Sequence, residues 1–158
     1  GIFDDPIKGF GVLTDYARRR AAIATGVGPR SARFEGLPPQ LDRYGDAFVD
    51  ATNKLATATD RILRKHGRGI IGKQFASRRL ADIMIDLFVL ASVLSRVATA
   101  VTEQEDASKE LEILQVFSAQ ALRRIEANFD RIDDNVDEAV KSLAAHAFEN
   151  EGYTWDSI

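Results

Sequence analysis

The residues best suited to chemistry in this sequence begin with a glycine-rich stretch. Gly67, Gly69 and Gly72 spell G-x-G-x-x-G, which binds dinucleotides where the first glycine follows a strand and the pyrophosphate meets a helix N-terminus. The preceding residues 55–65 (LATATDRILRK) have the composition of a helix instead. The glycines therefore predict a turn between two helices rather than a nucleotide site.

Side chains that ligate metals or act as nucleophiles are sparse. His66 and His146 are the only histidines, and the Glu-x-x-His spacing of a di-iron bundle is absent, since Leu63 and Leu143 occupy the glutamate positions. The chain has no cysteine, which excludes thiolate metal sites, disulfides and a cysteine nucleophile, and it has no G-x-S-x-G elbow. We therefore expect no catalytic, cofactor-binding or metal-ligating residue in this chain.

Charged side chains gather in the middle of the sequence. Arg78, Arg79, Asp82 and Asp86 follow one another at helical spacing, which predicts an ion-pair face at a surface or between domains, where docking would occur. Six basic residues without an acidic one lie between positions 64 and 79: Arg64, Lys65, Arg68, Lys73, Arg78 and Arg79. They would contact a phosphate, lipid headgroups or an acidic partner, or else compensate helix-end charge at a solvated surface.

The first 35 residues form a second candidate contact region. They carry six basic and four acidic residues, although the whole chain has a net charge of −3. An apolar face precedes three consecutive arginines: Phe3, Ile7, Phe10 and Leu13, then Arg18, Arg19 and Arg20. This combination is typical of an interfacial membrane anchor, because acyl-chain burial and attraction to anionic headgroups add. It is also typical of a helix that packs on its own bundle or on a neighbouring domain.

The elements that must position these residues are helices. All four prolines lie before residue 40, and the remainder is rich in Ala, Leu, Arg, Asp and Glu without alternating β-branched runs. A chain of 158 residues with 45% hydrophobic residues is large enough to bury a core. We predict an all-α chain, with an amphipathic segment and Gly/Pro linker over residues 1–35 and an antiparallel four-helix bundle over residues 36–158.

Apolar residues at spacings of three and four mark one face of three expected helices. These faces are Tyr44, Phe48, Ala51, Leu55, Ala58 and Ile62; Leu111, Leu114, Phe117, Ala121, Ile125 and Phe129; and Val136, Val140, Leu143 and Ala147. The first of these helices should begin at Pro38 and Pro39, because proline fits the first turn. Asp133 and Asp134 are the expected N-caps of the last helix.

The helix expected over residues 71–102 is apolar on two faces. The primary face is Leu80, Met84, Leu87, Ala91, Leu94, Ala98 and Val101, and the second is Ile85, Phe88, Val89 and Val93. Asp86 and Arg96 interrupt the apolar run and argue against a membrane span. Such a helix is expected at the centre of a bundle or packed against another domain or subunit.

Part of this region resembles a known family. Residues 65–70 (KHGRGI), 74–75 (QF), 79–82 (RLAD), 85–87 (IDL) and 93–96 (VLSR) resemble the extra C-terminal helical domain of very-long-chain acyl-CoA dehydrogenases and their relatives. The resemblance implies a non-catalytic accessory domain of an oxidoreductase that oxidises fatty acyl-CoA in β-oxidation. The FAD and the catalytic glutamate of such an enzyme lie in the preceding domains, so this chain holds no cofactor.

The resemblance also implies partners and a location. The partners expected are the catalytic domains of the parent chain, a second copy in a homodimer or other self-association, and an anionic membrane surface contacted peripherally. The expected location is intracellular, either cytoplasmic in a bacterium or on the matrix side in a mitochondrion. The first residue, Gly1, fits a domain excised from a larger chain. The mild net charge of −3 argues against nucleic acid.

Two other functions compete with this reading. One is a free-standing helical adaptor without an attached enzyme, and the other is a bundle that binds an acyl ligand in its core. An acyl-binding bundle would be stabilised against heat by fatty acyl compounds but not by short polar ligands.

Overall fold

A computed structural model describes residues 36–150 and Gly152. Four α-helices occur in this part of the chain, and no strand is present within it. The helices are α2 (Asp42–His66), α3 (Gln74–Glu103), α4 (Ser108–Asp133) and α5 (Asp137–Glu149). The all-α fold class predicted from the sequence is confirmed. Residues 1–35, including the expected membrane or partner contacts Phe3, Ile7, Phe10, Leu13, Arg18, Arg19 and Arg20, lie outside the described residues.

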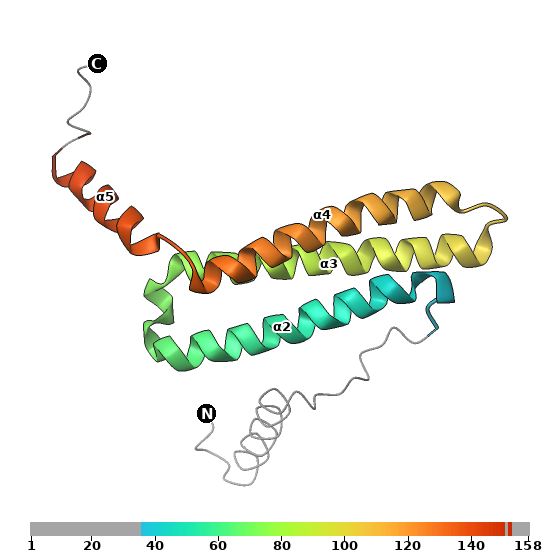
Figure 1. The fold of residues 1–158 in the computed structure, drawn as a ribbon, viewed down its shortest axis with the longest axis horizontal. Coiled ribbons are helices and arrows are strands. Elements are labelled where there is room, and N and C mark those ends of the chain that lie inside the picture. Colours follow the sequence, from blue (N-terminus) through green and yellow to red (C-terminus); the bar gives the residue numbers. More distant parts are fainter. Residues whose placement is uncertain (1–35, 151, 153–158) are drawn as a thin grey trace, which may run out of the picture.

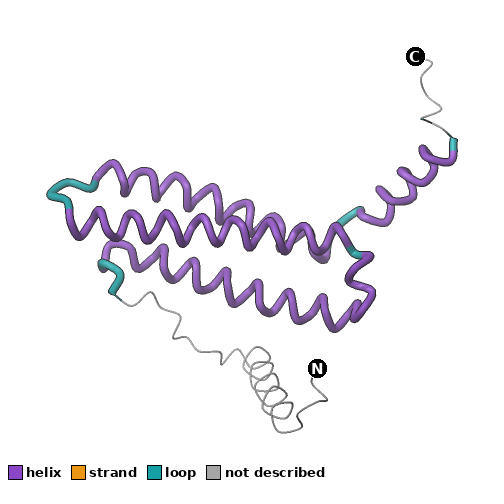
Figure 2. The backbone as a smooth tube through the Cα atoms, turned by 180° about the vertical axis from the view of Figure 1, so that it is seen from behind, coloured by secondary structure: helices purple, strands orange, loops and turns teal. Residues whose placement is uncertain are grey.

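The helices α2, α3 and α4 run side by side and alternate in direction, with α3 packing on both of the others (Figure 1). The helix α5 leaves this bundle at one end and points away from it, as the view from behind also shows (Figure 2). None of its residues is buried. The four expected helices therefore exist, but only three of them pack together in the described structure.

The entry into α2 follows the prolines, as expected. Pro39–Leu41 form a short 3-10 helix, and the amide of Leu41 donates a hydrogen bond to the carbonyl oxygen of Pro38 at 2.8 Å. This turn places the Leu41 side chain, which is fully buried, in the core against Tyr44. The prolines thus start the helix and also fix its first core contact.

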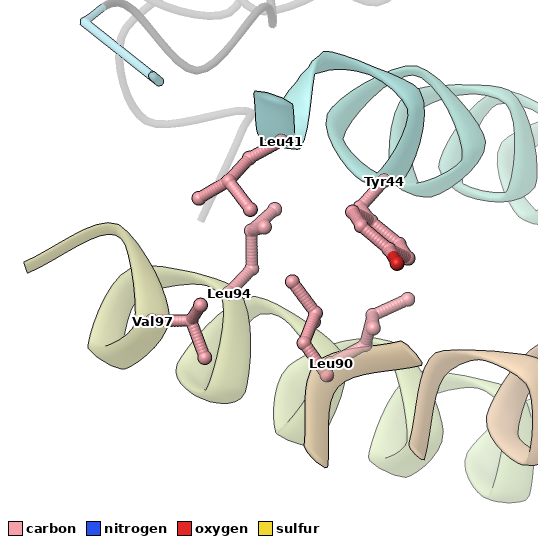
Figure 3. Close-up of a cluster of buried hydrophobic side chains, with 6 residues drawn as sticks. Leu41, Tyr44, Leu90, Leu94 and Val97 are labelled. Atoms are coloured by element: carbon pink, nitrogen blue, oxygen red, sulfur yellow. The ribbon is translucent and has the colours of Figure 1, made fainter. Parts of the chain in front are cut away.

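The core consists of two adjoining clusters along α3. One cluster joins the start of α2 to the C-terminal half of α3 and to α4; Figure 3 shows five of its residues. Its buried residues are Leu41, Tyr44, Leu90, Leu94, Val97 and Leu114. The other cluster joins the remaining lengths of the same helices through Ala51, Ala58, Ile83, Leu87, Ile125 and Phe129. The helix α3 contributes to both clusters and is the centre of the bundle.

The buried face of α3 differs from the predicted primary face. Its buried residues are Ile83, Leu87, Leu90, Leu94, Val97 and Ala100. Met84, expected in the core, is 53% exposed, and Phe88 and Val89 of the second face are also exposed. Because nearly every side of α3 is apolar, hydrophobic periodicity alone does not select the side on which α2 and α4 pack.

The length and apolar composition of α3 would suffice to cross a membrane, taken by themselves. The central helix of a bundle meets the same criteria. In the described structure α3 packs on both α2 and α4, and its Asp86 forms an ion pair with Arg124 of α4. These contacts agree with the core position inferred from the sequence.

The junction of α4 and α5 also differs from the sequence expectation. Asp133 is the last residue of α4 rather than an N-cap, and Asp134 follows it in extended conformation. Asn135 bridges the two helices. Its side-chain amide donates to the carbonyl of Arg131 at 3.1 Å, and its side-chain oxygen accepts from the amide of Asp137 at 3.2 Å. One side chain thus ends α4 and starts α5.

Candidate docking surface

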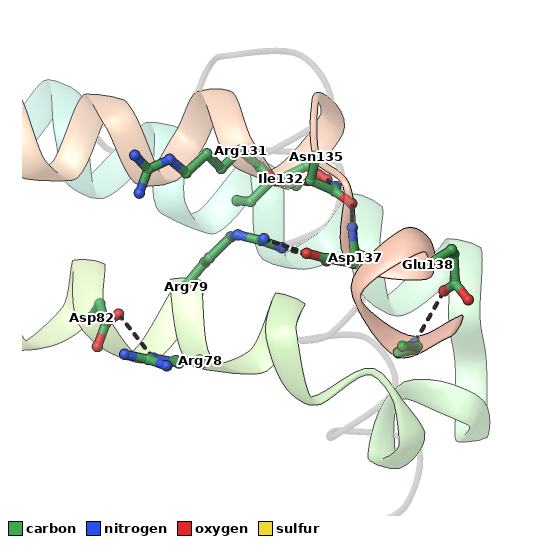
Figure 4. Close-up of polar contacts among 9 residues, drawn as sticks. Arg78, Arg79, Asp82, Arg131, Ile132, Asn135, Asp137 and Glu138 are labelled. Atoms are coloured by element: carbon green, nitrogen blue, oxygen red, sulfur yellow. Dashed lines mark hydrogen bonds and ion pairs between the residues drawn. The ribbon is translucent and has the colours of Figure 1, made fainter. Parts of the chain in front are cut away.

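The most enclosed ion pair in the described structure joins α3 to the first residue of α5. Both terminal nitrogens of Arg79 donate to the carboxylate of Asp137, at 2.7 and 2.6 Å (Figure 4). The two side chains are only 14% and 18% exposed. A planar guanidinium that meets a carboxylate with two parallel hydrogen bonds fixes orientation as well as distance. This fork therefore sets the direction in which α5 leaves the bundle.

A second contact supports the first at the root of α5. The ammonium of Lys73 lies 3.3 Å from the carboxylate of Glu138, which also accepts from Lys141 at 3.0 Å. Hydrogen bonds from these lysines lower the pKa of Glu138, and the hydrogen bonds from Arg79 lower the pKa of Asp137. Both acids stand in the first turn of α5, where negative charge also complements the helix dipole.

The four residues predicted as an ion-pair face are not brought together as one group. Arg78 contacts Asp82 within α3 at 3.8 Å, and both side chains are substantially exposed. Asp86 instead meets Arg124 of α4, with Oδ1 only 2.6 Å from a terminal guanidinium nitrogen. The four residues therefore serve three separate contacts, of which two join α3 to other helices.

The six-residue basic cluster is largely neutralised inside the chain. Arg64 pairs with Asp60, Lys73 with Glu138, Arg78 with Asp82 and Arg79 with Asp137. Arg61, just outside the cluster, pairs with Asp133 at the end of α4. This pairing favours charge compensation at the helix ends over a phosphate or lipid-headgroup site, which would need unpaired cations.

Replacing Arg79 with alanine should loosen α5 without unfolding the bundle, because α5 buries nothing and this fork fixes its root. We expect amide hydrogen exchange in α5 to accelerate about tenfold, the low end for loss of a hydrogen bond to a charged group that solvent partly reaches. Arg78→Ala, which removes an exposed contact within one helix, should leave α5 exchange unchanged. Equal exchange in the two variants would contradict the assigned role of Arg79.

Acid should have the same effect as this substitution. The pKa of Asp137 is lowered by its hydrogen bonds to Arg79, so the stabilising contribution is complete above the ordinary aspartate pKa. It is lost as the pH falls through the lowered value. Exchange in α5 measured against pH should therefore rise under acid conditions only, and the Arg79→Ala variant should lack that step.

The exposed side of α3 is the largest apolar feature outside the core. We define the α3 outer face as Met84, Ile85 and Phe88, which are 53%, 59% and 74% exposed. The positions beside them, such as Ala81 and Ser92, are small. The face is apolar and uncharged over about two helical turns. A contiguous apolar surface of this kind marks a contact with another protein surface or with a membrane.

The remaining sequence candidates lie apart from this face. The glycine pattern forms a 3-10 turn, Gly67–Gly72, that follows the helix α2, as expected for a helix connection. His66 ends α2, while His146 is exposed on α5 beside Glu149. Among the described residues no group of three or more His, Cys, Asp or Glu side chains is placed to hold a metal ion.

Sequence reasoning missed Arg124, Asp137 and Asn135 as positioning residues. Arg124 and Asp137 are separated from their partners by 38 and 58 residues, and no local spacing announces such pairs. Asn135 carried a detectable signal. An asparagine two residues before a run that starts with two acids is a common helix start.

Comparison with known proteins adds the family context. A family model described as the ACAD9/ACADV C-terminal domain matches residues 39–153. The very long-chain specific acyl-CoA dehydrogenase of Rattus norvegicus, described as mitochondrial, is 31% identical over 132 residues, which cover 83% of this chain and 20% of that protein. The protein of the same name from Homo sapiens is 36% identical over 104 residues, which cover 63% of this chain and 15% of that protein.

The chain therefore spans about a fifth or less of the length of these relatives. The family match covers the three bundled helices and α5, and it starts at Pro39, where the first described turn begins. The resemblance seen in residues 65–96 is confirmed by this match, which extends it across most of the chain. The chain belongs to the ACAD9/ACADV C-terminal domain family.

Proposed function

We propose that this chain is the accessory C-terminal domain of an FAD-dependent acyl-CoA dehydrogenase and that its role is to dock on the catalytic domains of the same protein. The relatives named as acyl-CoA dehydrogenases are about five times longer than the matching region, so the flavin chemistry belongs to the part of them that this chain does not span. A domain without catalytic residues of its own acts through the surfaces that it offers to its neighbours.

The observation that carries the proposal is the exposure of Phe88. This aromatic side chain is 74% exposed in the middle of the central helix, between Met84 and Ile85 on one side and Ser92 on the other. Burying such a ring in an interface releases ordered water from a large apolar area, and aromatic residues dominate the binding energy of protein contacts. The α3 outer face therefore has the character of an interface core, with Phe88 as its anchor.

The rigidity of α3 supports the same function. Six buried side chains hold this helix from its other side, so the outer face is presented without much conformational freedom. A contact made by a preorganised surface costs less entropy on binding than a contact made by a loop. The face would therefore position the domain on its parent with little cost in ordering.

The test uses the 158-residue chain and the catalytic region of the protein that contains it, mixed and followed by calorimetry. Phe88→Glu places a charge at the anchor, and we expect it to weaken the complex at least tenfold, as loss of a central aromatic anchor does. The matched control is Phe148→Glu. Phe148 is 88% exposed but lies on α5, away from the α3 outer face.

The outcomes separate cleanly. Weakening by Phe88→Glu alone supports docking through the α3 outer face. Equal binding by both variants and the unmodified chain would overturn it, and thermal stabilisation of the chain by fatty acyl compounds in place of binding would favour the acyl-ligand alternative. Membrane contact by residues 1–35 stays a prediction from the sequence, and sedimentation with anionic vesicles, with Arg18, Arg19 and Arg20 changed to alanine as the comparison, tests it.

A further inference from the structure

The helix α5 presents an apolar stripe that nothing in the described structure covers. Val136, Val140 and Leu143 are 70%, 45% and 53% exposed, and Ala147 continues the stripe one turn further on. Thirteen residues of regular helix extend away from the bundle and bury none of their side chains (Figures 1 and 2). An amphipathic helix of this kind normally lays its apolar side into a groove.

A groove of matching character lies on the bundle itself. It runs between α3 and α4 with a volume of about 570 Å3. Ile85 and Ala127 supply its apolar floor, and Arg123 and Arg131 stand at its edge on α4. Arg123 donates only to the carbonyl of Ala119 in its own helix, and neither arginine has a carboxylate partner within residues 36–150. The groove thus combines an apolar floor with two cations that are not neutralised.

Charge makes the two surfaces complementary. Three arginines and two aspartates line the groove, a formal charge of +1. Residues 137–158, which comprise α5 and the sequence after it, contain five acidic residues and one lysine, a formal charge of −4. The same acidity disfavours adsorption of α5 to an anionic membrane. The best match for the stripe is therefore a groove with cationic edges, and this chain carries one.

The groove of the same copy is not available to α5. Turning the stripe back onto its own bundle would rotate α5 about Asn135 and break the double hydrogen bond between Arg79 and Asp137, together with the hydrogen bonds of Asn135. These contacts hold the helix pointing outward. A second copy can receive α5 without any of these contacts being lost.

We propose that two copies of this chain exchange their α5 helices, so that the stripe of each lies in the α3–α4 groove of the other. Such an arrangement is isologous, since every copy supplies one arm and one groove, and it closes at a dimer. It goes beyond docking on a catalytic region, because it uses α5 and the α4 edge of the groove rather than Phe88.

Sedimentation equilibrium of the 158-residue chain is the first test. We expect a dimer whose dissociation constant rises at least tenfold in Leu143→Glu, which places a charge in the middle of the stripe. Ala145→Glu is the matched control, since it adds the same carboxylate to the exposed opposite side of α5 and should leave association unchanged. Both positions are exposed, so neither variant perturbs the core. A chain that stays monomeric at all concentrations would overturn the proposal.

Cysteine pairing is the second test, and the absence of native cysteine makes it clean. Ala127→Cys and Leu143→Cys are made in separate chains, mixed and oxidised. A disulfide between the two variants is expected, because the groove floor would face the stripe across the exchange. Disulfides only between two Leu143→Cys chains would show α5 pairing with α5 and would sink the proposal. Ala145→Cys mixed with Ala127→Cys should give little product.

Discussion

Replacing Leu94 with alanine is expected to lower the free energy of unfolding by about 2–5 kcal/mol, because the removed side chain leaves a cavity in a packed core. Leu94 is fully buried and belongs to the cluster that joins α2, α3 and α4. For a domain of this size the midpoint of thermal unfolding should fall by roughly 10 °C. Urea unfolding followed by circular dichroism measures the change directly.

The control for this prediction is Ile85→Ala on the same helix. Ile85 is 59% exposed, so its truncation removes little buried area and creates no cavity. We expect its cost in the isolated chain to stay within about 0.5 kcal/mol, the range of ordinary surface substitutions. A similar loss of stability in both variants would mean that the buried side of α3 has been assigned wrongly.

Enlarging Ala121 to leucine should destabilise the bundle by about 1–3 kcal/mol through overpacking. Ala121 is fully buried on α4, on the same side of the helix as Leu114 and Ile125, where a small residue lets the helices approach. The added carbons would have to displace α4 or force neighbouring side chains out of their preferred rotamers. The same urea titration gives the measurement.

Ala119→Leu provides the comparison for overpacking. Ala119 is exposed on the same helix, and leucine there has nothing to displace. Its stability should match that of the unmodified chain. If Ala121→Leu were as stable as Ala119→Leu, the packing around Ala121 would be looser than the structure indicates.

The helices α2 and α4 could be read from the sequence because each has a single apolar face. The predicted faces contain the buried residues Ala51 and Ile62 of α2, and Leu114 and Ile125 of α4. A helix with one apolar side has only one way to bury it, so periodicity and tertiary structure agree.

The helix α3 and the placement of α5 could not be read in the same way. Two overlapping apolar faces on α3 left Met84 and Leu90 nearly equivalent in the pattern, although one is half exposed and the other fully buried. The stripe of α5 was predicted at the right positions, but a stripe states which side of a helix is apolar and not what covers it. The direction of α5 depends on the pairing of Arg79 with Asp137, which only the tertiary fold brings together.

The central position of α3 has a consequence for how the chain folds. Its most extensive packing is with α4, the next helix along the sequence, from which it is separated by only four residues, Gln104–Ala107. Contacts between sequence neighbours close short loops and cost little chain entropy before they form. We expect an α3–α4 hairpin to form early, with α2 docking later onto a surface that is already present, and folding within microseconds to milliseconds, as in other helical bundles.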